Sequence, residues 1–291
     1  MRSLFALLLL PAFAFAQTAD EKKATLKFID SLRDPETGAW AVSPPKDGEK
    51  LKPSLRAVNG AVNALKFFGG EVTDKEKVTK FVMGCYDEKT GTFAEPGEKP
   101  TVASTCIGVL SATALGIDKA KYKKAMKYLG ENMKVFEDYR LTAAAIEAFG
   151  VKEADIDLRQ FGEKALLAHA TEAGPGLMSS PRAVGSFLAM YLRLGGKKDR
   201  SASGTDLQTL LRGQMKDGGW GKDDAKASDA ETTYRVMRAF MLLEEKPKDP
   251  EAVAKFVASC RRKDGGYGVD AEAPSSMSGV YYAAKITEWL K

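Results

Sequence analysis

The chain has 291 residues, of which 44 % are hydrophobic, so it is long enough to bury a large core. Its formal net charge of +5 is small and its acidic and basic residues are interleaved, which excludes a basic stripe for nucleic acid and a polybasic membrane patch. Three cysteines allow at most one internal disulfide, so the fold does not depend on a disulfide framework.

The first element in chain order is an apolar leader at residues 1–16. It contains one early positive charge, Arg2, an apolar run of about a dozen residues and the small-residue triplet Ala14-Phe15-Ala16. This pattern predicts a signal peptide that is cleaved after Ala16, because the run is too short to span a membrane as a helix. Residues 17–291 are therefore expected to form a single soluble domain, secreted or periplasmic, without a transmembrane segment.

An amphipathic helix pattern then recurs about every 45 residues. Near-identical copies occur at 78–85 and 253–260, where apolar residues fall at positions i, i+3, i+4 and i+7 of a helix. The other copies are more distant: 26–32, 122–129, 163–170 and 206–214. This repetition predicts six structural repeats.

A turn with a large side chain follows most copies after about six to eight residues. Glycine in such a turn supplies the positive φ that lets the chain reverse after a helix, and the next residue can wedge between neighbouring helices. We therefore assign the turns an architectural role. Their residues are Trp40, Phe93, Leu177, Gly218, Gly219, Trp220, Gly265, Gly266 and Tyr267.

A second amphipathic helix is expected after each turn, and no segment alternates with period two as a strand would. Small residues crowd these second helices, as at Ala143, Ala144 and Ala145, which permits the close packing of an inner ring. The segments are 56–69, 105–116, 140–150, 182–195, 232–243 and 279–290. Twelve helices in six hairpins predict an all-α fold, a closed α6/α6 toroid with the second helix of each repeat inside.

Two of the turns carry motifs that resemble a known superfamily. Residues 214–220, QMKDGGW, match the Q-x-x-x-G-x-W core of the repeat in squalene and hopene cyclases. Residues 260–268, CRRKDGGYG, are similar to the C-x-x-x-D-G-G-[FY]-G turn of protein prenyltransferase β subunits. The chain resembles this prenyltransferase and terpenoid-cyclase superfamily over nearly all of 17–291, which implies an α6/α6 barrel around a funnel-shaped cavity, often apolar and sized for an isoprenoid.

The metal site that the resemblance implies is incomplete. Prenyltransferase β subunits hold a catalytic zinc with an aspartate, a cysteine and a histidine at the start of a late inner helix, whereas the corresponding segment PSSMSGVYYAAK has no histidine. The only histidine, His169, lies in the fourth repeat and is expected to be a surface or capping residue. We therefore expect neither a metal nor a cofactor.

The catalytic acid of squalene and hopene cyclases, in a D-x-D-D motif, is also missing, since GKDDAKASDAE only approaches that motif. Asp223, Asp224, Asp229 and Glu231 could in principle supply a general acid and base, as paired carboxylates do in glycosidases. The alternative, which we favour, is that Ser228 or Asp229 caps the next helix and that Glu231 interacts with its dipole.

The cysteines are expected to be structural. Cys85 and Cys260 occupy the repeat position that holds Leu32, so they should be buried as small hydrophobic side chains. Cys106 has no identifiable base beside it to activate it as a nucleophile, and the C-G-E-Q motif of complement-like thioester domains is absent. A disulfide between Cys85 and Cys106 remains open at this point.

Arginines recur near the amino ends of the second helices, where they and the helix termini could make one mouth of the barrel attract anions. The resemblance implies that basic side chains in this region hold a diphosphate. The alternative is that each arginine pairs with a local acid, such as Asp138 or Glu231, or extends to solvent. The candidate ligand-binding residues at the cavity mouth are Arg56, Arg140, Arg182, Tyr234, Arg235 and Tyr281.

These observations favour an exported, non-catalytic toroid that binds a ligand or partner through its cavity or rim. The ligand would be an anionic or isoprenoid-like small molecule, or a protein, and not a nucleic acid. One alternative is a divergent enzyme of the isoprenoid superfamily, performing prenyl transfer or terpenoid cyclisation, for which the cavity should be an apolar funnel. A second is a carbohydrate-active α/α barrel, for which Asp223, Asp224 and Asp229 should point into an aromatic groove.

Overall fold

The computed structural model describes residues 17–46, 48–173, 180–196 and 204–291. The predicted signal peptide and the predicted turn at Leu177 lie outside these ranges. Within them the chain forms twelve α-helices, one short 3₁₀ helix (Lys119–Tyr122) and one antiparallel strand pair, β1 (Tyr86–Asp87) and β2 (Thr92–Phe93). The fold is therefore all-α.

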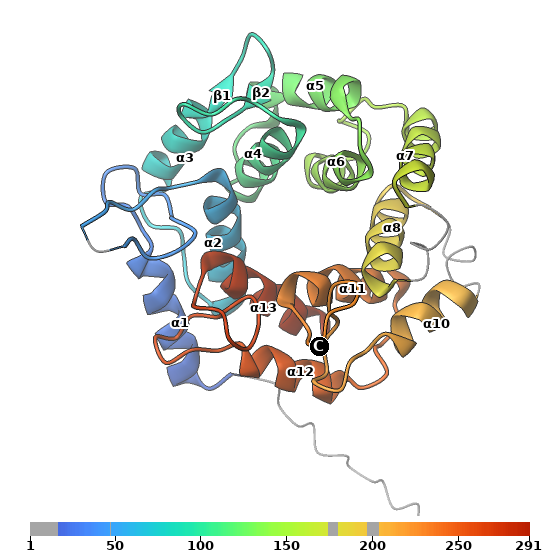
Figure 1. Cartoon of the computed structure of the whole chain (residues 1–291). Coiled ribbons are helices and arrows are strands. Elements are labelled where there is room, and N and C mark those ends of the chain that lie inside the picture. Colours follow the sequence, from blue (N-terminus) through green and yellow to red (C-terminus); the bar gives the residue numbers. More distant parts are fainter. Residues whose placement is uncertain (1–16, 47, 174–179, 197–203) are drawn as a thin grey trace, which may run out of the picture.

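Six of the helices form an inner ring around a central lumen (Figure 1). Each contacts the next in chain order and the last contacts the first, so the ring is closed. The inner helices are α2 (Leu55–Phe68), α4 (Val102–Ala114), α6 (Phe136–Phe149), α8 (Pro181–Arg193), α11 (Ala230–Leu243) and α13 (Met277–Trp289). The second helix of each hairpin, including the one that contains Val58 and Leu65, thus lies inside as predicted.

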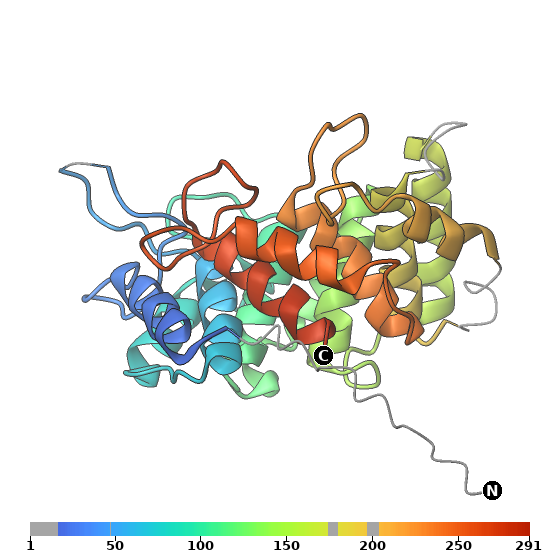
Figure 2. The same cartoon turned by 90° about the horizontal axis from the view of Figure 1, so that it is seen from below.

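The remaining helices lie outside this ring (Figure 1). They are α1 (Ala19–Ser31), α3 (Lys75–Gly84), α5 (Lys124–Asn132), α7 (Leu158–Ala173), α10 (Gly204–Arg212) and α12 (Pro250–Ser259). Seen from the side, the loops before α2, α11 and α13 project from one edge of the barrel (Figure 2). No helix among the described residues is long and apolar enough to cross a membrane.

Side-chain caps fix where five of the inner helices begin. The oxygen of a Ser, Thr or Asp at the N-cap accepts a hydrogen bond from a backbone N–H of the first turn, which would otherwise have no partner within the helix. Asp229 caps α11 by accepting a hydrogen bond from the backbone nitrogen of Thr232 at 2.8 Å. It was one of the two residues, with Ser228, that were predicted to cap this helix. The other caps are Ser54, Thr101, Ser180 and Ser276.

The glycine turns bring each hairpin against the outer helix that follows. Gly218 has φ +99°, and a Cβ at this position would lie 2.0 Å from the carbonyl oxygen of Ala252 in α12. Only glycine combines this backbone conformation with so close an approach. Trp220, two residues later, is fully buried and donates a hydrogen bond from Nε1 to the carbonyl oxygen of Leu210 at 2.8 Å.

The last turn closes the ring against the first helix. Gly265 has φ +87°, and a Cβ there would lie 2.5 Å from the carbonyl oxygen of Ala24 in α1. The hydroxyl of Thr25 donates a hydrogen bond to the carbonyl oxygen of Gly265 at 2.9 Å. The backbone nitrogen of Met277 donates one to the carbonyl oxygen of Val42 at 2.7 Å. The closure thus depends on backbone contacts between residues about 240 positions apart.

All three cysteines are free and buried. The Cys85–Cys106 disulfide that the sequence left open is therefore not formed. Burial raises the pKa of Cys85 to about 11 and that of Cys106 to about 12, so both stay protonated thiols at neutral pH.

Candidate functional site

A cavity of about 110 Å³ lies in the centre of the barrel, and we call it the lumen cavity. All six inner helices contribute to its wall, so its shape depends on the closed ring. Its polar lining residues are Arg56, Asn59, Arg140, Arg193, Tyr234, Ser278, Tyr281 and Tyr282, and its apolar ones include Ile107, Leu110, Leu141 and Ala144. The lining is mixed and is not the apolar funnel that an isoprenoid site would require.

A second space, of about 370 Å³, lies at the amino ends of α6, α8 and α11, and we call it the mouth pocket. Its lining residues are Phe136, Glu137, His169, Ser180, Arg182, Ala183, Ser186, Lys222, Asp223 and Arg235. The four arginines predicted to form one site are therefore divided: Arg56 and Arg140 line the lumen cavity, and the other two line the mouth pocket.

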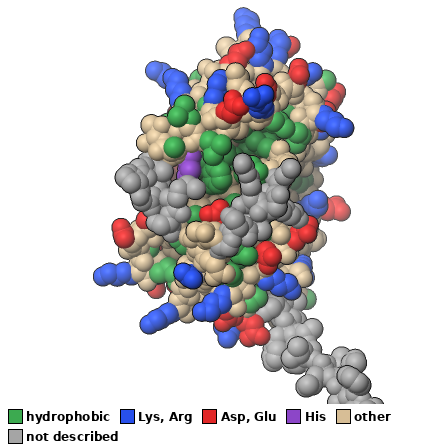
Figure 3. Space-filling model, turned by 90° about the vertical axis from the view of Figure 1, so that its right-hand side faces the viewer, with side chains coloured by type: hydrophobic (Ala, Val, Ile, Leu, Met, Phe, Trp, Pro, Cys, Tyr) green, Lys and Arg blue, Asp and Glu red, His purple; other side chains and the backbone are tan. Residues whose placement is uncertain are grey.

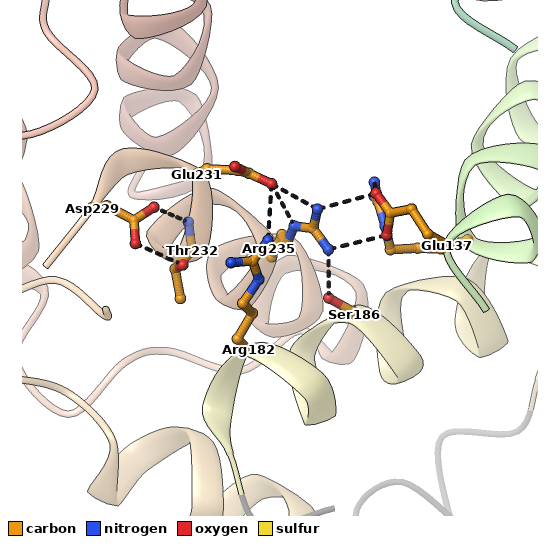
Figure 4. A network of polar contacts seen from close by, with 8 residues as sticks. Glu137, Arg182, Ser186, Asp229, Glu231, Thr232 and Arg235 are labelled. Atoms are coloured by element: carbon orange, nitrogen blue, oxygen red, sulfur yellow. Dashed lines mark hydrogen bonds and ion pairs between the residues drawn. The ribbon is translucent and has the colours of Figure 1, made fainter. Parts of the chain in front are cut away.

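Glu137 binds one arginine from each space, Arg140 of the lumen cavity and Arg235 of the mouth pocket. Figure 4 shows its contacts with Arg235. Its carboxylate accepts two hydrogen bonds from Arg140, at 2.6 and 2.7 Å, and two from Arg235, at 3.1 and 3.3 Å. Both contacts are bidentate, which fixes the orientation of the guanidinium groups. Burial acts to raise the pKa of Glu137, but the hydrogen bond and charge of Arg140 and the charge of Arg235 outweigh it and lower the pKa to about 2.

Glu231 extends this network toward the mouth (Figure 4). Its Oε1 accepts from Nη2 of Arg235 at 2.6 Å and from Nη2 of Arg182 at 3.3 Å. The interpretation that the arginines pair with local acids is thus correct for Glu231. It is wrong for Asp138, whose carboxylate accepts hydrogen bonds from the backbone nitrogens of Lys134 and Val135 at the start of α6.

A second charged cluster, which the sequence analysis missed, lies farther along the inner helices. Arg238 Nη2 lies 2.6 Å from both carboxylate oxygens of Glu147, and Arg193 Nε lies 3.2 Å from one of them. Arg238 also stands 5.4 Å from the centre of the Trp289 ring, a cation–π contact. The signal available in the sequence was that Arg238 follows Arg235 by three residues, one helical turn along the same face.

Arg193 stands out because its charge is buried and incompletely satisfied. Its side chain is 6 % exposed, and its Nε has no hydrogen-bond acceptor among the described residues, since the Glu147 contact has ion-pair distance without hydrogen-bond geometry. Burial lowers the pKa of Arg193 below its ordinary value, and Arg238 adds to this, against the opposing effect of Glu147. A buried cation of this kind is stabilised by an additional anion.

The inner helices carry a net positive charge. Their basic residues are Arg56, Lys66, Arg140, Arg182, Arg193, Arg235, Arg238 and Lys285, and their acidic residues are Glu137, Asp138, Glu147, Glu231 and Glu288. Arg56 lines the lumen cavity and makes no ion pair with any described residue. The lumen therefore has more positive than negative charge on its wall, which attracts anions.

His169 is not the surface residue that we expected. It is 5 % exposed, and its ring lies 4.4 Å from that of Phe136 and 5.3 Å from that of Phe187. Figure 3 shows this face of the molecule, where the histidine lies beside hydrophobic side chains. The expectation failed because Glu163 interrupts the apolar pattern of this helix, so the pattern did not indicate that this face of α7 packs inward.

The aspartates predicted as an alternative acid–base set do not converge on a cavity. Asp229 is engaged as the cap of α11, Asp223 lines the mouth pocket, and Asp224 is an exposed turn residue with φ +61°. Among the residues that the structure describes, no three His, Cys, Asp or Glu side chains are grouped as a metal site.

A larger groove, of about 480 Å³, lies on the outside of the barrel between α5 and α7. Its rim has Lys123, Lys127 and Lys164 but also Asp155 and Asp157, so its charge is nearly balanced. It does not reach the inner helices and has no counterpart to the arginine network.

Comparison with solved structures shows the same fold in several proteins. Candida albicans protein geranylgeranyltransferase-I complexed with GGPP is 12 % identical, with a TM-score of 0.69 over 92 % of this chain and 90 % of that one. A type II terpene cyclase from Scytonema in complex with merosterolic acid A is 10 % identical, with a TM-score of 0.61 over 94 % and 95 %. A glycoside hydrolase family 76 mannosidase from Bacteroides thetaiotaomicron is 11 % identical, with a TM-score of 0.61 over 94 % and 96 %.

At these identities the likeness extends to the fold alone. No curated protein matches the sequence significantly. The model of the prenyltransferase alpha-alpha toroid domain matches residues 1–139, 60–161 and 178–291, which together span most of the chain. The chain belongs to the prenyltransferase alpha-alpha toroid family.

Proposed function

We propose that this protein is an exported, single-domain toroid that binds a small anionic ligand in its lumen. The observation that carries the proposal is the excess of arginines over acids on the inner helices, together with the buried, incompletely satisfied Nε of Arg193. An anion between Arg56, which makes no ion pair with a described residue, and Arg193, whose Nε has no acceptor, would compensate charge that the protein itself leaves uncompensated. Export follows from the predicted signal peptide at residues 1–16.

The dimensions of the site limit the ligand. Pockets for drug-sized ligands measure about 300–1,000 Å³, so the lumen cavity at about 110 Å³ suits a phosphate- or carboxylate-sized group and not a long isoprenoid chain. The mouth pocket, at about 370 Å³, leaves room for a further part of the ligand. The neighbours that bind GGPP or merosterolic acid A make isoprenoid phosphates worth testing as ligands.

The paired carboxylates Glu137 and Glu231 do not favour glycoside hydrolysis, in which one carboxyl group must be protonated to donate a proton to the leaving group. Paired arginines hold the pKa of Glu137 at about 2, and Arg235 and Arg182 lower the pKa of Glu231 despite its burial. Both groups are therefore ionised at neutral pH and serve to hold the arginines. This argues for binding over hydrolysis at this pair.

The test is a thermal-shift titration with pyrophosphate, a farnesyl phosphate and a sugar acid at constant ionic strength. A ligand that binds only the folded protein raises the melting temperature by an amount that grows with the logarithm of the ratio of its concentration to its Kd. Arg193→Gln should weaken binding by roughly 10- to 100-fold, because a hydrogen bond to a charged group contributes about 1.5–3 kcal/mol.

Arg159→Gln is the matched control, since Arg159 forms an exposed ion pair with Glu163 on the outer helix α7. The control should bind as the wild type does. Equal shifts in wild type and Arg193→Gln, or no shift with any of the three anions, would refute the proposal.

A further inference from the structure

Two tyrosines from neighbouring helices lie side by side in the wall of the lumen cavity. Tyr234 of α11 and Tyr281 of α13 both line it, and their hydroxyl oxygens lie 3.1 Å apart. Their rings lie 5.5 Å apart, and Tyr234 also contacts the rings of Tyr282 and Trp289 at 5.3 and 5.1 Å. The aromatic packing holds the two hydroxyl groups in place beside the open space.

The charged groups around this pair are mostly positive. The Tyr234 hydroxyl lies in the electric field of three arginines, each of which favours its ionised form: Arg193 from α8, Arg238 from α11 and Arg140 from α6. The nearby acids are engaged elsewhere: Glu147 with Arg193 and Arg238, Glu137 with Arg140 and Arg235, and Glu231 with Arg182 and Arg235. From α13 the remaining titratable neighbour is Tyr282, and Arg56 of α2 lies across the cavity.

These surroundings make the two phenols unequal. Burial raises the pKa of Tyr234, but Arg193, the hydrogen bond with Tyr281, Arg238 and Arg140 together bring it below its ordinary value. Burial and the adjacent Tyr234 raise the pKa of Tyr281 well above the ordinary value. The pair therefore loses its first proton from Tyr234, at a lower pH than an ordinary phenol, and its second at a higher pH.

We propose that Tyr234 and Tyr281 form a proton-transfer dyad in which the Tyr234 oxygen accepts a proton from a small anionic substrate bound in the lumen cavity. The substrate class rests on the proposed function, whereas the dyad rests on the geometry of the lumen. Such a dyad would make the lumen a catalytic site as well as a binding site.

The step is a balanced proton transfer. The phenolate oxygen of Tyr234 forms an O–H bond as an O–H bond of the substrate, or a C–H bond next to a carbonyl group, breaks. The electron pair of that bond stays on the substrate as an oxyanion, in the second case as an enolate. Arg140 and Arg193, which line the same cavity, stabilise this negative charge. Tyr281 is a positioning residue, because its hydroxyl donates a hydrogen bond to the Tyr234 phenolate.

The experiment is a spectrophotometric titration of tyrosinate in the folded protein without ligand. One of the nine tyrosines should ionise below the ordinary pKa of about 10, and Tyr234→Phe should abolish that step. Tyr281→Phe should shift the step to higher pH, which a merely structural role for Tyr281 would not do. Tyr282→Phe is the matched control, because burial raises the pKa of this cavity residue to about 12 and its loss should leave the early step unchanged.

A wild-type protein without an early step, or an early step that persists in Tyr234→Phe, would overturn the dyad. If Tyr234→Phe does not fold, fluorotyrosine incorporated into the wild-type chain and followed by fluorine NMR reports the same ionisation. Because fluorine itself lowers the pKa of a phenol, the reference is free fluorotyrosine in the same buffer. The absence of any resonance that titrates at lower pH than this reference would again overturn the dyad.

Pyrophosphate separates this inference from the proposed function. A bound anion neutralises the arginines and should move the early step to higher pH, and by reciprocity pyrophosphate affinity should fall as Tyr234 ionises. An early step that pyrophosphate does not move supports the dyad and contradicts the anion site. A thermal shift with pyrophosphate but no early step supports the anion site and contradicts the dyad.

Discussion

At the scale of single residues, two carboxylates hold the arginines of the inner helices: Glu137 pairs with Arg140 and Arg235, and Glu231 pairs with Arg182 and Arg235. The recurrence of arginine near the amino ends of the inner helices was visible, and Glu231 was named, together with Asp138, as a local acid with which they could pair. In the structure Glu231 pairs with Arg235, four residues later in the same helix. The contact of Arg235 with Glu137, 98 positions away, was not predictable, because it depends on where α6 and α11 meet across the ring.

Glu137 gives a prediction about acid stability. Its pKa of about 2 in the folded protein lies below the ordinary 4.5, so the stability that its ion pairs contribute is present above about pH 4.5 and is lost as the pH falls toward 2. Glu137→Gln should therefore flatten this part of the curve of unfolding free energy against pH. At neutral pH it should cost on the order of 1 kcal/mol, because the side chain is 45 % exposed and solvent screens the pairs.

Chemical denaturation between pH 2 and 7 measures this effect, with Glu163→Gln as the control. Glu163 pairs with Arg159 on the outer surface, where the side chains are 65 % and 89 % exposed. Its replacement should leave the pH dependence unchanged. A Glu137→Gln curve parallel to that of the wild type would show that the ion pairs of Glu137 contribute nothing to stability.

At the scale of elements, the helices were predictable because each has one apolar face and most inner helices begin at a capping residue. The expected inner segments 56–69 and 232–243 differ by one or two residues from α2 and α11. The hydrophobic pattern of α7 was less informative, and the burial of His169 was missed for that reason. What the pattern cannot show is which part of each helix faces the lumen.

Replacing glycine by alanine should change the stability in opposite directions at two positions, one in a turn and one inside a helix. Gly218→Ala should destabilise the protein by about 1–3 kcal/mol or more, because φ is +99° and the new Cβ would clash with the carbonyl of Ala252. Gly162→Ala, within α7 and with nothing within 4 Å of the added Cβ, should instead stabilise by about 0.5–1 kcal/mol. Urea unfolding of the two variants tests this, and similar stabilities would contradict the architectural role of the turn at Gly218.

At the scale of the whole molecule, closure of the ring creates the lumen. The contact of α13 with α2 and the hydrogen bonds from Thr25 to Gly265 and from Met277 to Val42 join the two ends of the chain. The sequence supported a closed toroid through its repeats and through its resemblance to a family with that architecture. It placed Arg56, Arg140, Tyr234 and Tyr281 at the mouth of a cavity, and in the structure these four residues line the lumen itself. It did not predict that the lumen would be narrow or that Arg193 would join them, because that depends on side-chain directions that a repeat pattern leaves undefined.

The most direct test of the anion site is a crystal structure of the protein soaked in tungstate, an electron-dense oxyanion that anomalous scattering locates without ambiguity. Our account predicts a tungstate in the lumen cavity, in contact with Arg140 and Arg193 and displaced by pyrophosphate. Tungstate bound only at the lysines of the outer groove, or an empty lumen at concentrations that occupy that groove, would contradict it.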